Sequence, residues 1–109
     1  EEAGYLAACE LLNSNQKFDA ICAASDLIAI GAMRALAEHN LKIPEDVAVV
    51  GFDDIPIASF TNPALTTARQ NTILAGELLV EKLLKLIKGE EAGTTLMPTS
   101  LIVRKSCGS

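Results

Sequence analysis

Two adjacent carboxylates, Asp53 and Asp54, follow an apolar run in the stretch VAVVGFDDIP, residues 47–56. Acidic side chains at the end of a buried strand have three common uses. They can hold a metal ion or a phosphoryl group, accept hydrogen bonds from a ligand, or cap the next helix without any chemistry. Only one of two adjacent residues can occupy a cap position, so the other is free to face a ligand.

A second polar pair, Ser25 and Asp26, follows another apolar stretch, residues 20–24. The pair stands where the N-terminal cap of a helix belongs. Capping is the simplest interpretation of both Asp26 and Asp54, because an acid there satisfies free backbone amides and favours the helix dipole. Ligands of open α/β sheets bind beyond the carboxyl ends of the strands. The two polar pairs are therefore expected on one rim of a sheet, where they can face one ligand.

Apolar periodicity, caps and breakers predict the elements that would position these loops. The expected helices span residues 4–13, 27–39 and 72–88, and the expected strands span residues 20–24, 47–50, 65–69 and 99–104. The second of these strands lacks polar alternation, which is typical of a parallel strand covered on both faces. The sequence thus predicts an α/β fold with a three-layer, open and mostly parallel sheet.

The expected helix over residues 27–39 has two apolar faces. The predicted core face consists of Ala29, Ala32, Met33 and Leu36. The opposite stripe consists of Leu27, Ile30 and Gly31, beside Arg34. An exposed apolar stripe predicts an interface with another chain, unless a neighbouring segment of the same chain covers it. In the helix over residues 72–88, Gly76 lies on the apolar face and suggests close approach to a partner element.

The composition of the chain argues against several classes of protein and of binding site. The chain has 109 residues, half of them apolar, which is typical of one folded domain. Its formal net charge is -5 and its basic residues are scattered, so it lacks the basic patch of a nucleic-acid-binding surface. Its three cysteines and one histidine indicate neither a disulfide framework nor a His/Cys metal cluster. Neither a signal peptide nor a membrane-spanning apolar run is visible, so the expected location is the cytoplasm.

No arrangement of residues indicates catalysis. A phosphoryl-accepting receiver domain would need a third aspartate, for which Asp26 could serve, and a lysine at the end of a central strand, which the sequence lacks. There is no G-x-S-x-G motif, and His39 at a helix end is better interpreted as a surface residue than as a base. We therefore expect no catalytic residue, no metal and no cofactor.

The stretches FDAICAASDLIAIGAMRALAEHNLKIPEDVAVVGFDDIPIASFTNPALTTARQ and LMPTSLIVRKS closely resemble the C-terminal part of the lactose-repressor/galactose-repressor (LacI/GalR) family of bacterial transcription regulators. Those regulators resemble type I periplasmic sugar-binding proteins, in which a small effector lies in the cleft between two α/β subdomains. The resemblance implies the effector-sensing and dimerising part of a transcription regulator, with a sugar or nucleobase-like effector. The alternative is a periplasmic sugar-binding protein of a transport system.

The resemblance also implies roles for individual residues. It makes Asp53 the carboxylate that contacts the effector and leaves Asp54 to start the following turn or helix. Gln70 falls where the family places a polar residue at the cleft, and Ser25 stands where many members have asparagine. We expect Phe52 either at the ligand or packed beneath the loop. The implied dimer interface lies on the helix that begins at Leu27, with Ile30, Gly31 and Arg34.

In this interpretation residues 1–109 are a partial effector-binding domain, the C-terminal subdomain together with a crossover helix at residues 71–88 that would dock on the other subdomain. The helix-turn-helix sequence through which such regulators bind operator DNA does not occur in these residues. We expect the isolated chain to associate with itself through the Leu27 stripe, the crossover helix, or both.

Overall fold

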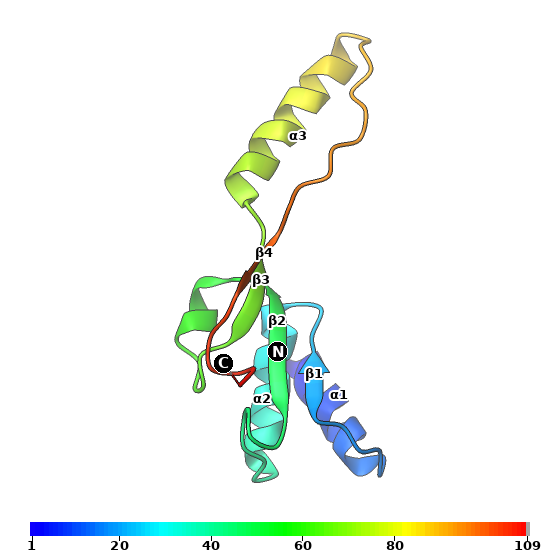
Figure 1. Ribbon diagram of the computed structural model, residues 1–109. Helices are drawn as coiled ribbons and strands as arrows, with labels where there is room; N and C mark the ends of the chain where they lie inside the picture. The colour runs from blue at the N-terminus through cyan, green and yellow to red at the C-terminus, as the bar shows by residue number, and fades with distance from the viewer. Residues whose placement is uncertain (109) are drawn as a thin grey trace. The chain divides into compact units, whose positions relative to one another are not determined.

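The computed structural model describes residues 1–108, which fall into two compact units. The first unit comprises Glu1–Arg69 together with the chain from Leu101 onwards, and the second comprises Gln70–Ser100. In chain order the elements are α1 (Glu2–Asn13), β1 (Ala20–Cys22), α2 (Asp26–Glu38), β2 (Ala48–Asp53), the 3-10 helix η1 (Pro56–Ser59), β3 (Thr66–Arg69), α3 (Thr72–Ile87) and β4 (Ser100–Ile102). All of them except η1 are labelled in Figure 1. The predicted α/β class and succession of elements are confirmed.

The four strands form one sheet in the order β1-β2-β3-β4. Strand β2 pairs in parallel with β1 and with β3, and the second pairing extends to Asp53 opposite Arg69. This last pair explains why β2 runs three residues beyond the predicted end at Val50, because the neighbouring strand continues to supply backbone partners. Along β2, Val49 and Gly51 are buried, while the residues that alternate with them are half-buried.

Helix α2 supplies much of the core. The four residues of its predicted core face, Ala29, Ala32, Met33 and Leu36, are all buried. They pack in two clusters, one with Val49 and Leu65 and the other with Ala8 of α1. The helix ends as predicted, because Asn40 adopts the left-handed conformation at φ 58 directly after the cap residue His39.

Helices α1 and α2 approach each other at two glycines. A side chain on Gly4 would collide with the backbone of Ile28, and one on Gly31 would collide with the backbone of Glu1 and Tyr5. The assignment of Gly31 to an exposed stripe is therefore wrong, because α1 buries it within the same chain. Only the absence of a Cβ lets the two helix backbones come this close.

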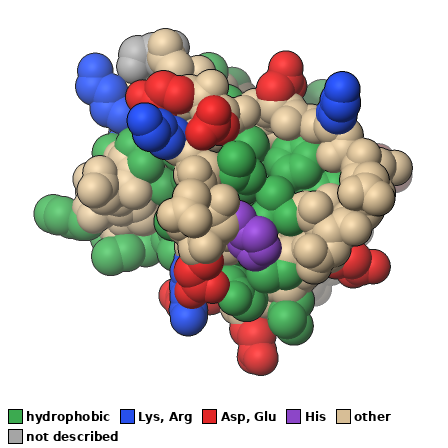
Figure 2. Space-filling model, turned by 90° about the horizontal axis from the view of Figure 1, so that it is seen from below, with side chains coloured by type: hydrophobic (Ala, Val, Ile, Leu, Met, Phe, Trp, Pro, Cys, Tyr) green, Lys and Arg blue, Asp and Glu red, His purple; other side chains and the backbone are tan. Residues whose placement is uncertain are grey.

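The histidine caps α2 rather than standing free. Nδ1 of His39 lies 2.8 Å from the carbonyl oxygen of Ala35, so the ring donates to a backbone acceptor at the helix end. Figure 2 shows this histidine among apolar side chains on one face of the molecule. No helix in residues 1–108 has the length and apolar character needed to cross a bilayer.

In the second unit, α3 begins at an Asn71 cap, whose side chain accepts from the backbone N–H of Leu74 at 3.0 Å. It ends before Gly89, which has φ +78, as predicted. Lys82 donates to the backbone oxygens of Ala92 and Gly93, so the following segment is tied to the helix. None of the α3 residues is buried, and within residues 1–108 a Cβ at Gly76 would meet nothing within 4 Å, so the close approach to a partner element that the sequence suggested stays a prediction.

Candidate functional site

Polar side chains gather at the edge of the sheet where the three parallel strands end. Ser25 follows β1, Asp53 is the last residue of β2, and Arg69 is the last residue of β3. Because neighbouring parallel strands point the same way, these ends share one rim, and Asp53 stands directly beside Arg69 in the strand register. The sequence predicted this common rim from the two polar pairs, and the strand pairing confirms it.

The backbone at the end of β2 is strained. Asp53 has φ 109 and Asp54 has φ 54, both in the region that favours glycine. A residue held in such a conformation costs on the order of 1–3 kcal/mol, and it persists only where the surrounding contacts determine it. Two in succession indicate that the direction of these side chains is set by the surrounding structure rather than by local preference.

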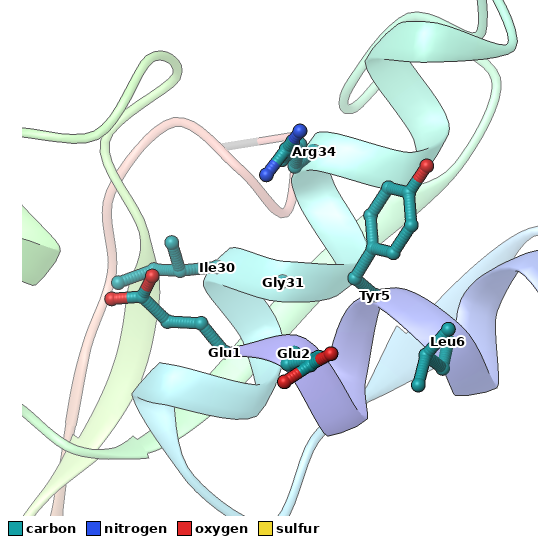
Figure 3. Close-up of a pocket in the computed structure, with 7 residues that line it drawn as sticks. All are labelled: Glu1, Glu2, Tyr5, Leu6, Ile30, Gly31 and Arg34. Atoms are coloured by element: carbon teal, nitrogen blue, oxygen red, sulfur yellow. The ribbon is translucent and has the colours of Figure 1, made fainter.

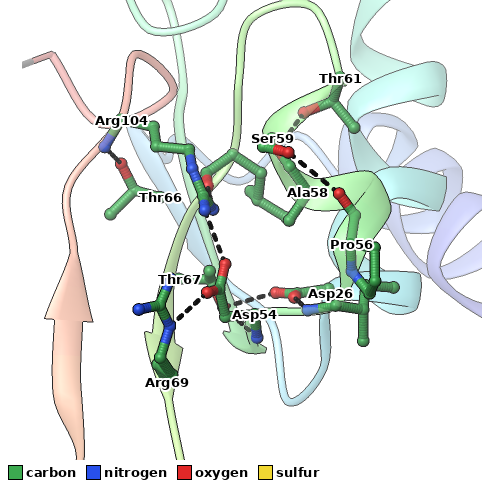
Figure 4. A network of polar contacts seen from close by, with 12 residues as sticks. Asp26, Asp54, Pro56, Ala58, Ser59, Thr61, Thr66, Thr67, Arg69 and Arg104 are labelled. Carbon is green, nitrogen blue, oxygen red and sulfur yellow. Dashed lines mark hydrogen bonds and ion pairs between the residues drawn. The ribbon is translucent and has the colours of Figure 1, made fainter.

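Asp54 does not cap the next helix, contrary to the capping interpretation, and lies instead in the connection between β2 and η1. The 3-10 helix η1 begins at Pro56 with Ile55 as its cap, and no side chain caps it. The Asp54 carboxylate instead accepts from Nε of Arg69 at 2.6 Å and from Nη2 of Arg104 at 2.8 Å, with its side chain only 7% exposed (Figure 4). Two cations converge on this one acid.

The pKa of Asp54 reflects this enclosure. Burial alone would raise it, and burial is the largest single influence. The hydrogen bonds from Arg69 and Arg104, together with their positive charges, outweigh burial and hold the pKa of Asp54 below its ordinary value of 3.8. The charged form of Asp54 is therefore favoured, and its carboxylate is already occupied by protein partners.

Asp26 is also not a helix cap. The cap of α2 is Ser25, whose hydroxyl accepts from the backbone N–H of Ile28 at 3.3 Å. Asp26 begins the helix proper and is completely buried. Its Oδ1 accepts from the hydroxyl of Thr67 at 2.6 Å, and its Oδ2 accepts from the backbone N–H of Ile55 at 2.8 Å. The carboxylate thus joins the start of α2 to β3 and to the loop after β2.

The last described residues of the chain fasten β2 to β3. The hydroxyl of Ser106, fully buried, donates to the carbonyl of Val49 at 2.5 Å and accepts from the backbone N–H of Thr66 at 2.8 Å. The guanidinium of Arg104 also donates to the carbonyl of Leu65 at 2.8 Å. Sequence reasoning assigned no role to Arg69, Arg104 or Ser106, although two of them lie in the LIVRKS motif that carried the resemblance.

The four residues predicted to bind a ligand divide between the two units. Ser25 and Phe52 are half-buried and Asp53 is exposed, and all three belong to the rim of the first unit. Gln70 is exposed and begins the second unit, directly after β3 in the chain. The first unit therefore brings together a hydroxyl, an aromatic ring and a carboxylate at one sheet edge.

The remaining interface candidates lie on the outer side of α2. The side chain of Leu27 is 47% exposed, Ile30 is half-buried, and Arg34 is exposed. A hollow of about 410 Å³ lies between the start of α1 and the middle of α2 (Figure 3), lined by Glu1, Glu2, Tyr5, Leu6, Ile30, Gly31 and Arg34. This surface combines apolar and charged groups next to the point where α1 covers Gly31.

A polar cluster links α1 to α2 beside the hollow. The hydroxyl of Tyr5 donates to Glu38 at 2.6 Å, and Nε of Arg34 donates to the same carboxylate at 3.0 Å. The guanidinium of Arg34 also lies 5.1 Å from the centre of the Tyr5 ring, within cation–π range. The hydrogen bond to Glu38 is the main cause that raises the pKa of Tyr5 to about 12, and the hydrogen bond from Tyr5 is the main cause that lowers the pKa of Glu38.

The sequence of this chain is similar to those of known proteins. A family model described as a periplasmic binding protein-like domain matches residues 1–107. The lactose operon repressor of Rhizobium radiobacter is 43% identical over 106 residues, which cover 96% of this chain and 94% of that sequence. The lactose operon repressor of Escherichia coli K12 is 38% identical over 105 residues, which cover 95% of this chain and 29% of that protein.

The fold agrees with solved relatives. The crystal structure of a lac repressor dimer bound to operator and the anti-inducer ONPF matches with a TM-score of 0.89 at 38% identity, covering 96% of this chain and 37% of that one. The chain thus spans less than two fifths of that repressor and of the E. coli protein. These relatives are transcriptional repressors, which are not enzymes, and they favour a regulator over a transport protein. The chain belongs to the periplasmic binding protein-like domain family, within which its relatives are repressors of the LacI type.

Proposed function

We propose that this chain is the effector-sensing and dimerising part of a transcription regulator that responds to a sugar or a related small molecule. The observation that carries the proposal is the exposed carboxylate of Asp53, which lies at the edge of the sheet where the parallel strands end and has a strained backbone conformation. Its neighbour Asp54 is enclosed by two arginines. Similarity to lactose operon repressors supports a sugar as the effector class.

The chemistry of the rim suits a polyhydroxylated ligand. An ionised carboxylate accepts through two oxygens, so Asp53 can take hydrogen bonds from two neighbouring hydroxyls of one sugar ring. Ser25 adds a short hydroxyl at the same rim, and Phe52 offers an apolar face on which a ring can rest. Gln70 is proposed as a fourth contact on the strength of the family resemblance.

The proposed role needs no covalent chemistry. In residues 1–108, no group of three or more His, Cys, Asp or Glu side chains is placed to hold a metal ion. We infer that this chain is not an enzyme and that the effector acts by binding unequally to two arrangements of the regulator. Operator DNA would then be bound through a separate helix-turn-helix domain, and the protein would work in the cytoplasm where its DNA lies.

Dimerisation is proposed for the outer surface of α2. Leu27 and Ile30 provide apolar area, and Arg34 provides a charged edge beside the hollow at the start of α1. A two-fold dimer uses the same surface on both subunits, so one continuous patch is sufficient. Gly31 contributes to this surface by letting α1 pack closely against α2, and it is not itself exposed.

Calorimetry of a full-length regulator that carries this sequence tests the proposed function. Lactose, galactose, ribose, cellobiose, maltose and purine bases are titrated into the parent protein and into Asp53→Asn, which keeps the shape of the side chain but removes its charge. We expect one of these compounds to bind, and the substitution to weaken its binding about tenfold to a hundredfold, because hydrogen bonds to a charged group contribute about 1.5–3 kcal/mol.

Asp19→Asn is the matched control, because Asp19 is an exposed aspartate in the segment that precedes β1. It should leave affinity unchanged. Binding by Asp53→Asn that equals the parent would remove Asp53 from the site, and an absence of binding by the parent to every compound would count against the effector class.

A further inference from the structure

The turn that carries Asp53 is fixed by buried polar groups that do not reach the rim themselves. Asp26 and Thr67 are both completely buried. The Thr67 hydroxyl donates its single hydrogen to Oδ1 of Asp26 at 2.6 Å, and its oxygen accepts the backbone N–H of Asp54 at 3.3 Å. Oδ2 of Asp26 accepts the next backbone N–H, that of Ile55, at 2.8 Å. Two successive amides after Asp53 are therefore bound to one buried pair.

These hydrogen bonds are made at the turn whose backbone is strained. Asp53 and Asp54 have positive φ, and a non-glycine residue does not hold such a conformation without support. The amides that receive the support belong to Asp54 and Ile55, directly after the carboxylate proposed to bind the effector (Figure 4). Release of these amides would let the turn relax to ordinary angles and would redirect the Asp53 side chain.

The absence of a side chain at Gly51 of β2 leaves room for the buried carboxylate of Asp26. A Cβ built on Gly51 would collide with Oδ1 of Asp26 and would lie 3.1 Å from a methyl group of Leu65. The glycine in GFDD thus lacks a side chain because the buried carboxylate occupies the place where one would be. This observation is independent of the hydrogen bonds, and it identifies the same carboxylate as a fixed part of the turn.

We propose that Asp26 and Thr67 are positioning residues for Asp53, holding the turn over residues 53–55 in the one conformation that presents the Asp53 carboxylate to the effector. The inference rests on the proposed function of Asp53. Neither residue touches the ligand, because both are buried beneath the turn. Their effect is on the fraction of protein whose turn is competent to bind, and the apparent dissociation constant rises in proportion as that fraction falls.

Thr67→Val tests the proposal because it removes the hydroxyl and keeps the shape, whereas Thr67→Ser keeps the hydroxyl. Both are made in the full-length regulator and titrated with the sugar of the panel above that binds the parent most tightly. We expect Thr67→Val to weaken binding about tenfold, which corresponds to a competent fraction of roughly one tenth, and Thr67→Ser to stay within about twofold of the parent. Asp26→Asn should weaken binding in the same direction.

A control matched for stability separates positioning from general destabilisation. Leu36→Ala removes a fully buried side chain of α2 that packs in the core with Val49 and Leu65, and its thermal midpoint provides the comparison. We expect it to lower the midpoint at least as much as Thr67→Val while leaving affinity unchanged. Equal losses of affinity in Leu36→Ala and Thr67→Val would overturn the positioning role.

A crystal structure of Thr67→Val gives a readout that needs no ligand. The proposal expects Asp53 or Asp54 to leave the positive φ region in the variant, and an unchanged turn would overturn it. If no compound binds the parent protein, the proposed function fails while this structure still decides the positioning role. If the parent binds a sugar and the turn is unchanged in the variant, the proposed function stands and the positioning role fails.

Discussion

Helices α2 and α3 are both amphipathic and both capped by a side chain, yet only one of them is buried. Helix α2 places Ala29, Ala35 and Leu36 entirely out of solvent, while α3 has no buried residue within the described chain. The apolar side chains of α3 that remain exposed include Ile73, Leu79, Val80, Leu83, Leu86 and Ile87. Caps and periodicity are local and are satisfied in both helices, whereas burial requires a partner surface that only α2 finds in its own unit.

The largest expected effect contrasts one leucine in each helix. Leu36→Ala should lower the free energy of unfolding of the 109-residue chain by about 2–5 kcal/mol, because it leaves a cavity beside β2. Leu83→Ala in α3 should change it by less than about 0.5 kcal/mol, since the side chain is 56% exposed. Urea unfolding of both variants measures the difference, and similar losses would mean that α3 is packed in solution.

A second contrast uses the two helical glycines. Gly31→Ala should destabilise the chain by about 1–3 kcal/mol, because the new methyl group collides with the backbone at the start of α1. Gly76→Ala should stabilise α3 by about 0.5–1 kcal/mol, because nothing lies within 4 Å of the new group and alanine is the better helix former. Helix content by circular dichroism and urea unfolding report both. A loss at Gly76 would indicate that a second copy of the chain covers this face.

The smallest effect concerns pH. Glu38 has a lowered pKa, so its stabilising contribution is present above its ordinary value of 4.5 and is lost as the pH falls through the lowered one. Tyr5 has a pKa raised to about 12, so its contribution is present below 10 and is lost between 10 and about 12. Both effects are small because the cluster is exposed and screened.

Thermal unfolding across these two pH windows checks the expectation. Glu38→Gln should flatten the response in both windows, because it removes the titrating carboxylate and the negative charge to which Tyr5 and Arg34 donate. Glu81→Gln is the control in α3, where the pair with Lys85 is long at 3.9 Å and exposed. A response that Glu38→Gln leaves unaltered would assign the pH dependence to other groups.

Self-association of the 109-residue chain would show whether the exposed apolar side chains of α2 and α3 find a partner in a second copy. The surfaces available for it are the outer side of α2 around Leu27 and the apolar side chains of α3. Sedimentation that shows a monomer at high concentration would mean that neither surface finds a partner in a second copy. Concentration-dependent dimers would support one of them, and Leu27→Glu against Val80→Glu would show which.

Much of the architecture could be predicted from the residues alone. The periodicity of α2, the breaker at Asn40 and the glycine after α3 each act over a few neighbouring residues, so one stretch of sequence contains the whole signal. The common rim of Ser25 and Asp53 followed from strand ends in a parallel sheet. The likeness of the GFDD and LIVRKS stretches to a known family was similarly a property of the sequence.

Tertiary structure alone decided which partners Asp26 and Asp54 have. Both residues were interpreted as helix caps, and nothing in their neighbouring residues distinguished a buried cross-link from a doubly paired ion. Their partners Thr67, Arg69 and Arg104 are 15 to 50 residues away in the chain, as in the 41-residue separation of Asp26 from Thr67. Such pairs exist only after strands distant in sequence become neighbours, and the same reason explains why α1 rather than solvent covers Gly31.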